Sequence, residues 1–441
     1  LFLPKLMALL ALSSLRCIVY LLLVSISFGD PVSPEVIRTV HDAFRLSSSY
    51  ARLKSQGTAA GKKLRSAKRA ARAAIRDFVS SLWTSARSNL ATVQFAQQKL
   101  YELERTCYKE NLLDILGELA AFYEMRAKND PECMAEDQTK SPLQMRCFPR
   151  SVGVALDILH RAGELREMER IFGEAKQVKG SKGKPVLRWP NLMMRPPITL
   201  AGVRELPVWT RADSEQVADI MEILERGVST FKTELQRLKR QGVFREAYAF
   251  AQGSWDRVGL FPAPDGSPHW ADAVCKITPK TCAAFRNALP GRQRGLPYLQ
   301  HNTEEVVFFH GSPFSHVLPH NGGSNCRINI HIGLEGYEDS KVVVHTNTTT
   351  ALTLAWSDKT AMAFNDGWTH EVINGPGHRY VLAVAIMHPD IQEAHFAEAF
   401  NGRTDVVEFG RGKLAQYQKM GKKQQLPKEP LRKPHKVTTE L

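Results

Sequence analysis

The chain has 441 residues, of which 43% are hydrophobic and 24% are charged. These proportions are ordinary for a globular protein, so they exclude global disorder, and the length predicts two to three domains. The formal net charge of +14 at pH 7 would suit an anionic partner. Whether it indicates one depends on where the basic residues lie along the chain.

The N-terminal segment predicts entry into the secretory pathway. Residues 7–28 are apolar apart from Arg16, several serines and Cys17. The small residues ahead of Asp30 fit the cleavage site of a signal peptide at residues 1–29. The same stretch is about long enough to span a bilayer, so a single-pass signal anchor is the alternative. Either case predicts the endoplasmic reticulum or the wider secretory pathway as the location.

Residues 30–176 predict a helical domain. Ile75, Phe78 and Val79 recur at the spacing of one helix face, and residues 112–120 carry a second stripe of this kind. Such stripes are more typical of a packed helix core than of a cofactor site. The role of this domain stays open.

Basic residues gather in a run from Arg52 to Arg76 and in a C-terminal tail at 401–441. The run holds nine Lys or Arg and no Asp or Glu. Aromatic residues do not alternate with the basic ones, as binding to a nucleic-acid single strand would require. The sequence therefore predicts that this basic segment forms a solvated face of a helix and that the tail is disordered. It predicts no nucleic-acid partner.

Six of the seven cysteines lie beyond the leader. An even number in an oxidising compartment permits disulfides, but spacing alone does not assign the pairs. No CxxC or His-rich spacing indicates zinc.

Residues 184–400 form a further predicted domain, which begins with Pro- and Trp-rich segments. A long amphipathic helix follows, with Asp213 or Ser214 as its N-cap and an apolar stripe that begins at Val217 and includes Met221. This stripe predicts a helix that packs its apolar face against the rest of the domain.

The second half of this domain shows the pattern of half-buried antiparallel strands. Short runs alternate polar and apolar residues and are broken by Gly, Pro and Asn, which predicts a β-barrel or jelly roll. Arg327, Asn329 and His331 share one face of a strand, and the other face carries Cys326, Ile328, Ile330 and Ile332. One face is therefore predicted to lie in an apolar core, and the other to line something polar.

His320, His370 and Arg379 are the candidate site residues outside that strand. Neutral imidazoles bind transition metals, and a guanidinium pairs with a carboxylate through two parallel hydrogen bonds. Spacing alone also fits hydrogen-bonded structural histidines. The residues raise the hypothesis of a pocket for a metal and an organic acid.

Two sequence motifs connect these candidate residues with a known protein family. Residues 317–334 read VLPHNGGSNCRINIHIGL, residues 364–372 read FNDGWTHEV, and Arg379 and the sequence HPD at 388–390 follow. Together they resemble the aspartyl/asparaginyl β-hydroxylase family, a branch of the 2-oxoglutarate- and Fe(II)-dependent oxygenases. The resemblance implies an α+β protein in which an N-terminal helical domain precedes a double-stranded β-helix, or jelly-roll, oxygenase domain.

The resemblance also assigns roles to single residues. It makes His320 and His370 the Fe(II) ligands. Most oxygenases of this class carry a carboxylate ligand where this chain has Gly322, but the family resembled here also has Gly and completes the metal shell with water. Arg379 and His331 match residues that hold 2-oxoglutarate.

Other matches are less central to the metal. Trp368 and Asp366, just ahead of the second ligand, could orient it or line the pocket, and Trp368 is equally compatible with simple packing. Cys275 and Cys282 match a disulfide of the family.

Two residues depart from the family pattern. Asn329 stands where family members usually carry a second Arg, and Phe309 stands where they carry Ser. Both family residues help to bind the co-substrate, and a charge-assisted hydrogen bond is roughly twice as strong as a neutral one. Weakened binding through Arg379, His331 and Asn329 is therefore expected.

The resemblance implies a dioxygenase that uses Fe(II) and 2-oxoglutarate to hydroxylate an Asp- or Asn-like side chain of a protein or peptide. The alternative is a non-catalytic β-helix binding module whose helical half binds a partner. The sequence does not predict the substrate or the oligomeric state.

Overall fold

The computed structural model describes part of the chain, namely residues 34–55, 61–86, 102–104, 106–108, 112–129, 147–179, 185–187, 189–196, 199–200, 202–247, 251–262, 269–293 and 304–392. The leader and the tail at 401–441 lie outside these ranges, so the signal peptide, the signal anchor and the disordered tail stay predictions. None of the helices in the described ranges combines the length and apolar character needed to cross a membrane.

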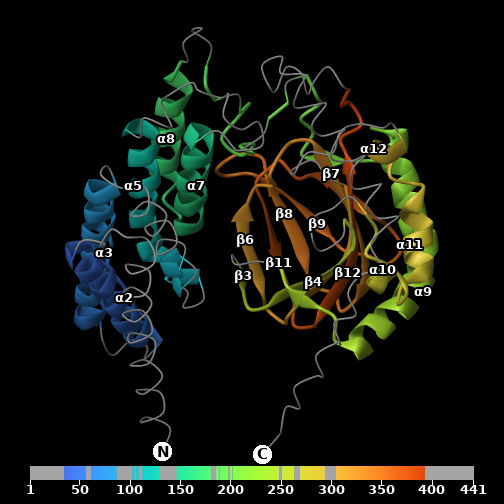
Figure 1. Cartoon of the computed structure of the whole chain (residues 1–441), viewed down its shortest axis with the longest axis horizontal. Helices are drawn as coiled ribbons and strands as arrows, with labels where there is room; N and C mark the ends of the chain where they lie inside the picture. Colours follow the sequence, from blue (N-terminus) through green and yellow to red (C-terminus); the bar gives the residue numbers. More distant parts are fainter. Residues whose placement is uncertain are drawn as a thin grey trace, which may run out of the picture. The chain divides into compact units, whose positions relative to one another are not determined.

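The chain divides into two compact units. The helical unit contains residues 1–137 and 146–187, and the barrel unit contains residues 138–145 and 188–441. The described helices of the first unit are α2 (Pro34–Ser55), α3 (Gly61–Ala86), α5 (Leu113–Asn129), α7 (Cys147–Ala162) and α8 (Leu165–Gln177), drawn from blue to green in Figure 1. Helix α2 packs against α3, and α5 packs against α7. The predicted stripes supply the core, in which Ile75, Phe78, Ile115 and Leu116 are fully buried.

The barrel unit is built from two antiparallel sheets. The seven-stranded sheet has the order β1 (Val208–Trp209), β10 (Met362–Asn365), β7 (Arg327–Glu335), β12 (Arg379–Met387), β5 (Glu305–Gly311), β4 (Trp255–Phe261) and β2 (Arg245–Glu246). The five-stranded sheet has the order β3 (Ala251–Gln252), β6 (His316–His320), β11 (His370–Ile373), β8 (Lys341–His345) and β9 (Ala351–Ala355). Along the chain from β5 to β12 the strands cross repeatedly between the two sheets, as in a jelly roll. The predicted mixture of helices with antiparallel sheet is confirmed.

The core of the barrel unit lies on the outer side of the larger sheet. Helix α9 (Glu215–Gln241) runs along that sheet (Figure 1), and its buried Val217, Ile220 and Leu224 belong to the same apolar cluster as Ile328 and Ile330 of β7. Because side chains alternate along a strand, the polar residues of β7 face the space between the two sheets. The predicted division of this strand into an apolar and a polar face is confirmed.

Three caps stabilise the ends of α9 and the start of a neighbouring helix. The Ser214 hydroxyl accepts a hydrogen bond from the Val217 amide, and Gly242 ends the helix at a φ of 58°, a left-handed conformation that glycine adopts without strain. Near its end, α9 carries the buried Glu234, whose carboxylate accepts hydrogen bonds from the Lys280 and Thr281 amides. These amides lie in the first turn of α11 (Pro279–Arg286), which Glu234 therefore caps. The short helices α10 (Asp272–Cys275) and α12 (Pro290–Gln293) complete this layer.

Candidate active site

His320 and His370 come together between the two sheets. His320 ends β6, His370 begins β11, and the two residues lie directly opposite each other in the antiparallel register. Their ring centroids are 4.3 Å apart. Both side chains are buried, with 7% and 5% of their surface exposed. The strand pairing thus brings together the two histidines that the family resemblance assigns to iron.

Both histidines present the ring nitrogen that a metal needs. The Nδ1 of His320 lies 2.8 Å from the carbonyl oxygen of Leu318, and the Nδ1 of His370 lies 2.8 Å from that of Trp368. A carbonyl oxygen can only accept, so each Nδ1 carries the proton and each Nε2 carries the lone pair. Burial also lowers the pKa of His370, which favours the neutral ring. Two neutral imidazoles with Nε2 lone pairs have the chemistry that binding a transition metal requires.

The site offers no carboxylate ligand from Gly322. A Cβ atom placed there would lie 1.8 Å from Oδ2 of Asp366, so this carboxylate already fills the space of a side chain. Within the ranges that the structure describes, no group of three or more His, Cys, Asp or Glu side chains could hold a metal.

Asp366 is held by the polar face of β7. Its Oδ2 accepts a hydrogen bond from Nη2 of Arg327 at 2.6 Å, and its Oδ1 accepts one from Nδ2 of Asn329 at 2.7 Å. Burial by itself would raise the pKa of Asp366, but the nearby Arg327 guanidinium keeps this pKa below its usual value. Asn329 therefore binds Asp366, at the position where the family carries an Arg for the co-substrate.

Arg379 is a buried cation that contacts one polar and one aromatic side chain. It is 1% exposed, donates from Nε to Oδ1 of Asn374 at 2.6 Å, and lies 4.3 Å from the centre of the Trp356 ring. Burial lowers its pKa to about 9, so it stays cationic at neutral pH. Among the described residues no carboxylate lies within 4.0 Å of it. A buried charge of this kind needs a counter-ion, which an acidic ligand would provide.

His331 lies between this cation and the histidine pair. Its ring centroid is 6.3 Å from that of Trp356, and the Phe364 ring lies 5.3 Å from His331 and 5.0 Å from His370. The Nδ1 of His331 is buried and has no hydrogen-bond partner among the described residues. Burial, together with the positive charge of Arg379, lowers the pKa of His331 to about 3. A row of ring contacts thus runs from His370 to Arg379 and contains an unsatisfied polar atom that a ligand could pair.

Phe309 fills the place where the family carries Ser with an aromatic ring. This ring stacks on Trp255 with centroids 4.8 Å apart and lies 6.4 Å from the ring of His331. A phenyl ring offers no hydrogen bond to a carboxylate. Both departures from the family pattern therefore remove polar contacts from the expected acid pocket.

The segment before α9 braces the two loops that carry His320 and His370, a role that the sequence did not reveal. The carbonyl oxygen of Met193 accepts hydrogen bonds from Nδ2 of Asn321 at 3.1 Å and from the Thr369 amide at 2.6 Å. Asn321 follows His320, and Thr369 precedes His370. Arg195 adds a hydrogen bond from Nη1 to the Thr369 hydroxyl at 2.8 Å. Trp356 and Asn374 beside Arg379 were also missed, because no local pattern marks a residue whose role depends on a distant partner.

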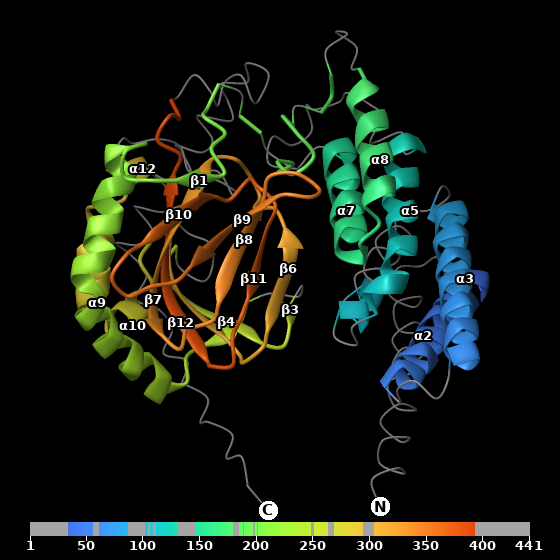
Figure 2. The same cartoon turned by 180° about the vertical axis from the view of Figure 1, so that it is seen from behind.

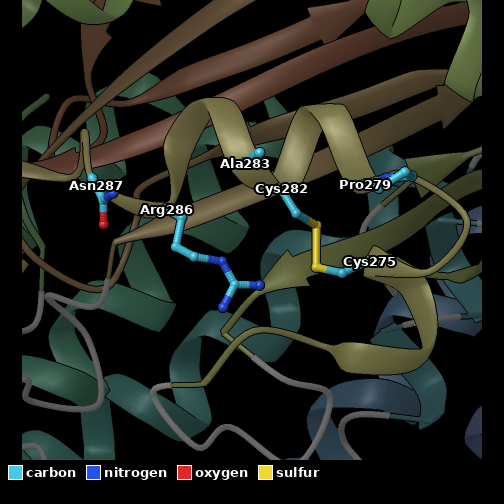
Figure 3. Close-up of a pocket in the computed structure, with 6 residues that line it drawn as sticks. All are labelled: Cys275, Pro279, Cys282, Ala283, Arg286 and Asn287. Carbon is cyan, nitrogen blue, oxygen red and sulfur yellow. A yellow bond between two sulfur atoms is a disulfide. The ribbon is translucent and has the colours of Figure 1, made fainter.

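Cys275 and Cys282 form a disulfide with an S–S distance of 2.09 Å. It joins α10 to α11 and lines a pocket of about 340 Å³ together with Pro279, Ala283, Arg286 and Asn287 (Figure 3). None of the histidines of the candidate site lines this pocket. Cys326 is a buried thiol, and burial raises its pKa to about 12.

Fold and site together define a jelly-roll domain with a buried histidine pair and a buried arginine. Residues 218–389 match the family model described as Aspartyl/Asparaginyl beta-hydroxylase. The predicted resemblance to this family is thereby confirmed for residues 218–389, which are less than half of the chain.

Curated relatives carry the same name. The aspartyl/asparaginyl beta-hydroxylases of Mus musculus and Homo sapiens are each 24% identical over 197 residues, which are 43% of this chain and 24% of the relative. The aligned part therefore spans about a quarter of the length of these relatives.

Solved structures overlap with part of the chain. A prolyl-4-hydroxylase from Pseudomonas putida is 14% identical and covers 37% of this chain and 87% of its own, with a TM-score of 0.26. A prolyl hydroxylase from Trichoplax adhaerens, in complex with a peptide fragment of hypoxia inducible factor, is 10% identical and covers 43% of this chain and 97% of its own, with a TM-score of 0.28.

Proposed function

We propose that the barrel unit is a double-stranded β-helix dioxygenase that uses Fe(II) and 2-oxoglutarate to hydroxylate an Asp- or Asn-like side chain of a protein or peptide. The proposal rests on the presence, in one site, of two buried histidines and a buried arginine. Each histidine carries its proton on Nδ1, and no described carboxylate neutralises the arginine. The family match supports a hydroxylase. The identity of the substrate comes from the relatives' name alone.

His320 and His370 would hold the metal through Nε2. When bound, Fe(II) and 2-oxoglutarate would supply the oxidising power to place one oxygen atom of O₂ in a substrate C–H bond and the other in succinate, with release of CO₂. The protein's own residues fix the positions of the two proposed ligands. The carbonyls of Leu318 and Trp368 fix the two imidazoles, and the Met193 carbonyl ties their loops together.

Arg379 and His331 would hold the acid. The Arg379 guanidinium would pair with one carboxylate of 2-oxoglutarate, which would supply its counter-ion in a pocket closed to bulk water. The Nδ1 atom of His331 would gain the hydrogen-bond partner that it lacks among the described residues. Asn329 would contribute little, because Asp366 already accepts from its amide.

The disulfide supports a location in the secretory pathway. Disulfides persist in oxidising compartments and are rare in the cytosol, and Cys275 and Cys282 are linked here. Together with the leader-like N-terminal segment, the linkage favours the endoplasmic reticulum over the cytosol.

The competing function is a non-catalytic binding module, which the altered acid pocket favours. Asn329 is engaged by Asp366 and Phe309 stacks on Trp255, so two family contacts to the co-substrate are absent. Such a barrel would not turn over 2-oxoglutarate.

An anaerobic titration of the full-length chain with Fe(II) and 2-oxoglutarate tests the proposal. We expect the visible charge-transfer band of a metal chelated by the keto acid, and formation of succinate once O₂ is admitted. His320→Ala should lose the band, whereas His378→Ala, at an exposed histidine outside the site, should keep it. A band without succinate, in the presence of candidate peptides, would favour the binding module. Absence of iron from the unaltered protein would contradict the dioxygenase and likewise favour the binding module.

A further inference from the structure

The hairpin formed by β8 and β9 stands beside the histidine pair. The His345 amide at the end of β8 donates to the carbonyl oxygen of Thr369 at 2.8 Å, and Thr369 immediately precedes His370. The hairpin closes through the Thr346 amide, which donates to the Thr350 carbonyl at 3.0 Å. Figure 2 shows β6, β11, β8 and β9 side by side in this order. The turn of this hairpin therefore lies at the end of the barrel where the two metal-binding loops lie.

One row of residues runs across this sheet from the histidines to its edge. His320 pairs with His370, His370 pairs with Val344, and Val344 pairs with Leu352. Residues that pair directly in an antiparallel sheet point to the same face. Leu352 thus projects from the inner face, on the same level as the proposed metal ligands. With strands about 4.8 Å apart, two strands place it roughly 10 Å from His370.

Leu352 is exposed although it faces inward. It is 40% exposed, while Val344 next to it in the row is completely buried. Among the described residues the other exposed large hydrophobic side chain is Phe314. The Phe314 amide donates to the carbonyl oxygen of Gly375, which follows the far end of β11 from His370. Phe314 therefore lies at the opposite end of the barrel. At the end that carries His320 and His370, Leu352 is the exposed large apolar side chain among the described residues.

We propose that Leu352 is a specificity-determining residue, which contacts an uncharged, apolar side chain of the peptide substrate about three residues from the side chain that is hydroxylated. The spacing follows because an extended peptide advances about 3.3 Å per residue, so three residues cover the roughly 10 Å between Leu352 and His370. The turn of the hairpin, residues 346–350, contains only Thr and Asn and brings no charge to this position. The inference rests on the proposed hydroxylase function and names the kind of substrate segment that this site accepts.

The test uses the full-length chain loaded with Fe(II) and 2-oxoglutarate and a library of peptides with one central Asp or Asn. Each flanking position from four before to four after is set in turn to Leu, Ser, Lys or Glu, and hydroxylation is read as a gain of 16 Da by mass spectrometry. We expect a preference of roughly tenfold for Leu over Glu near three residues from the target, the size of discrimination that one apolar contact gives. Leu352→Ala should remove this preference, and Leu352→Glu should shift it towards Lys.

The preference is a ratio between peptides measured with one protein, so a variant with less iron or less folded protein leaves it unchanged. Thr353→Glu is the matched control, since Thr353 is exposed on the same strand but pairs with Val343 and points to the other face. This control should keep the preference of the unaltered protein. Hydroxylation without any positional preference, or a preference that survives in Leu352→Glu, would overturn the role of Leu352 and leave the hydroxylase function standing. If no peptide gains 16 Da, the hydroxylase function fails in this assay and the inference falls with it.

Discussion

The Asp366 carboxylate occupies the volume that a side chain at Gly322 would need. The Cβ position of Gly322 lies 1.8 Å from Oδ2 of Asp366, and the Gly322 amide donates to the Asp366 carbonyl oxygen at 2.7 Å. The absence of a side chain at position 322 is therefore a packing requirement of this chain. A carboxylate cannot be restored at 322 without moving Asp366 away from Arg327 and Asn329.

Gly322→Asp is expected to lower stability and to add no metal ligand. Forcing a side chain into a filled site costs typically 1–3 kcal/mol, and the new carboxylate would face Asp366 at close range. The midpoint of thermal unfolding and the iron content of the purified variant measure the two effects. Gly173→Ala is the control, because a Cβ there meets nothing within 4 Å and alanine favours a helix. A Gly322→Asp variant with unchanged stability and tighter iron binding would show that Asp366 yields its place easily.

Arg379→Ala is expected to abolish binding of 2-oxoglutarate, and Asn329→Arg to strengthen it. Hydrogen bonds to charged groups contribute about 1.5–3 kcal/mol, which corresponds to roughly ten- to a hundredfold in affinity. Isothermal titration of the metal-loaded protein with 2-oxoglutarate gives both dissociation constants. An unchanged affinity in both variants would show that the pocket does not hold a dicarboxylic acid.

His331 is expected to make stability fall below pH 6.5. Its pKa is lowered from 6.5 to about 3 in the folded protein, so between these values the unfolded chain binds one more proton than the folded one. Stability from this group is fully present above the unfolded pKa and falls by about 1.4 kcal/mol per pH unit as the pH drops towards 3. Urea unfolding of the unaltered protein and of His331→Gln, at pH 7.5 and pH 5, isolates the contribution. Parallel pH profiles for the two proteins would contradict a neutral, buried His331.

Removal of the disulfide by Cys275→Ser with Cys282→Ser is expected to destabilise the barrel unit. The two cysteines are 7 residues apart. Closing a loop of that length lowers the conformational entropy of the unfolded chain, which stabilises the folded protein by about 2.5 kcal/mol at 25 °C. Chemical unfolding measures the loss, and peptide mapping without reduction identifies the linkage. Two alkylated thiols at these positions in protein collected from the secretory pathway would refute the pair.

Local patterns predicted much of the barrel unit. The alternation from Cys326 to Ile332 gave both faces of β7, and Ser214 was one of two candidate caps for α9. The sequence could not show that the apolar face of β7 packs against α9 rather than against the second sheet, because both arrangements bury the same residues. The meeting of Gly322 with Asp366, and of Arg379 with Trp356, joins residues far apart in the chain. Those contacts depend on sheet register, which no local pattern reveals.

The Met193 carbonyl has a practical consequence for anyone who trims this protein. One oxygen atom receives hydrogen bonds from the residue after His320 and from the residue before His370, so it ties the two loops together from outside the strands that carry these histidines. A fragment cut to the boundaries of the family match, 218–389, would retain every named ligand and yet lack that anchor. Such a fragment also lacks β1, which pairs with β10, so loss of activity in the fragment would say nothing about the intact chain.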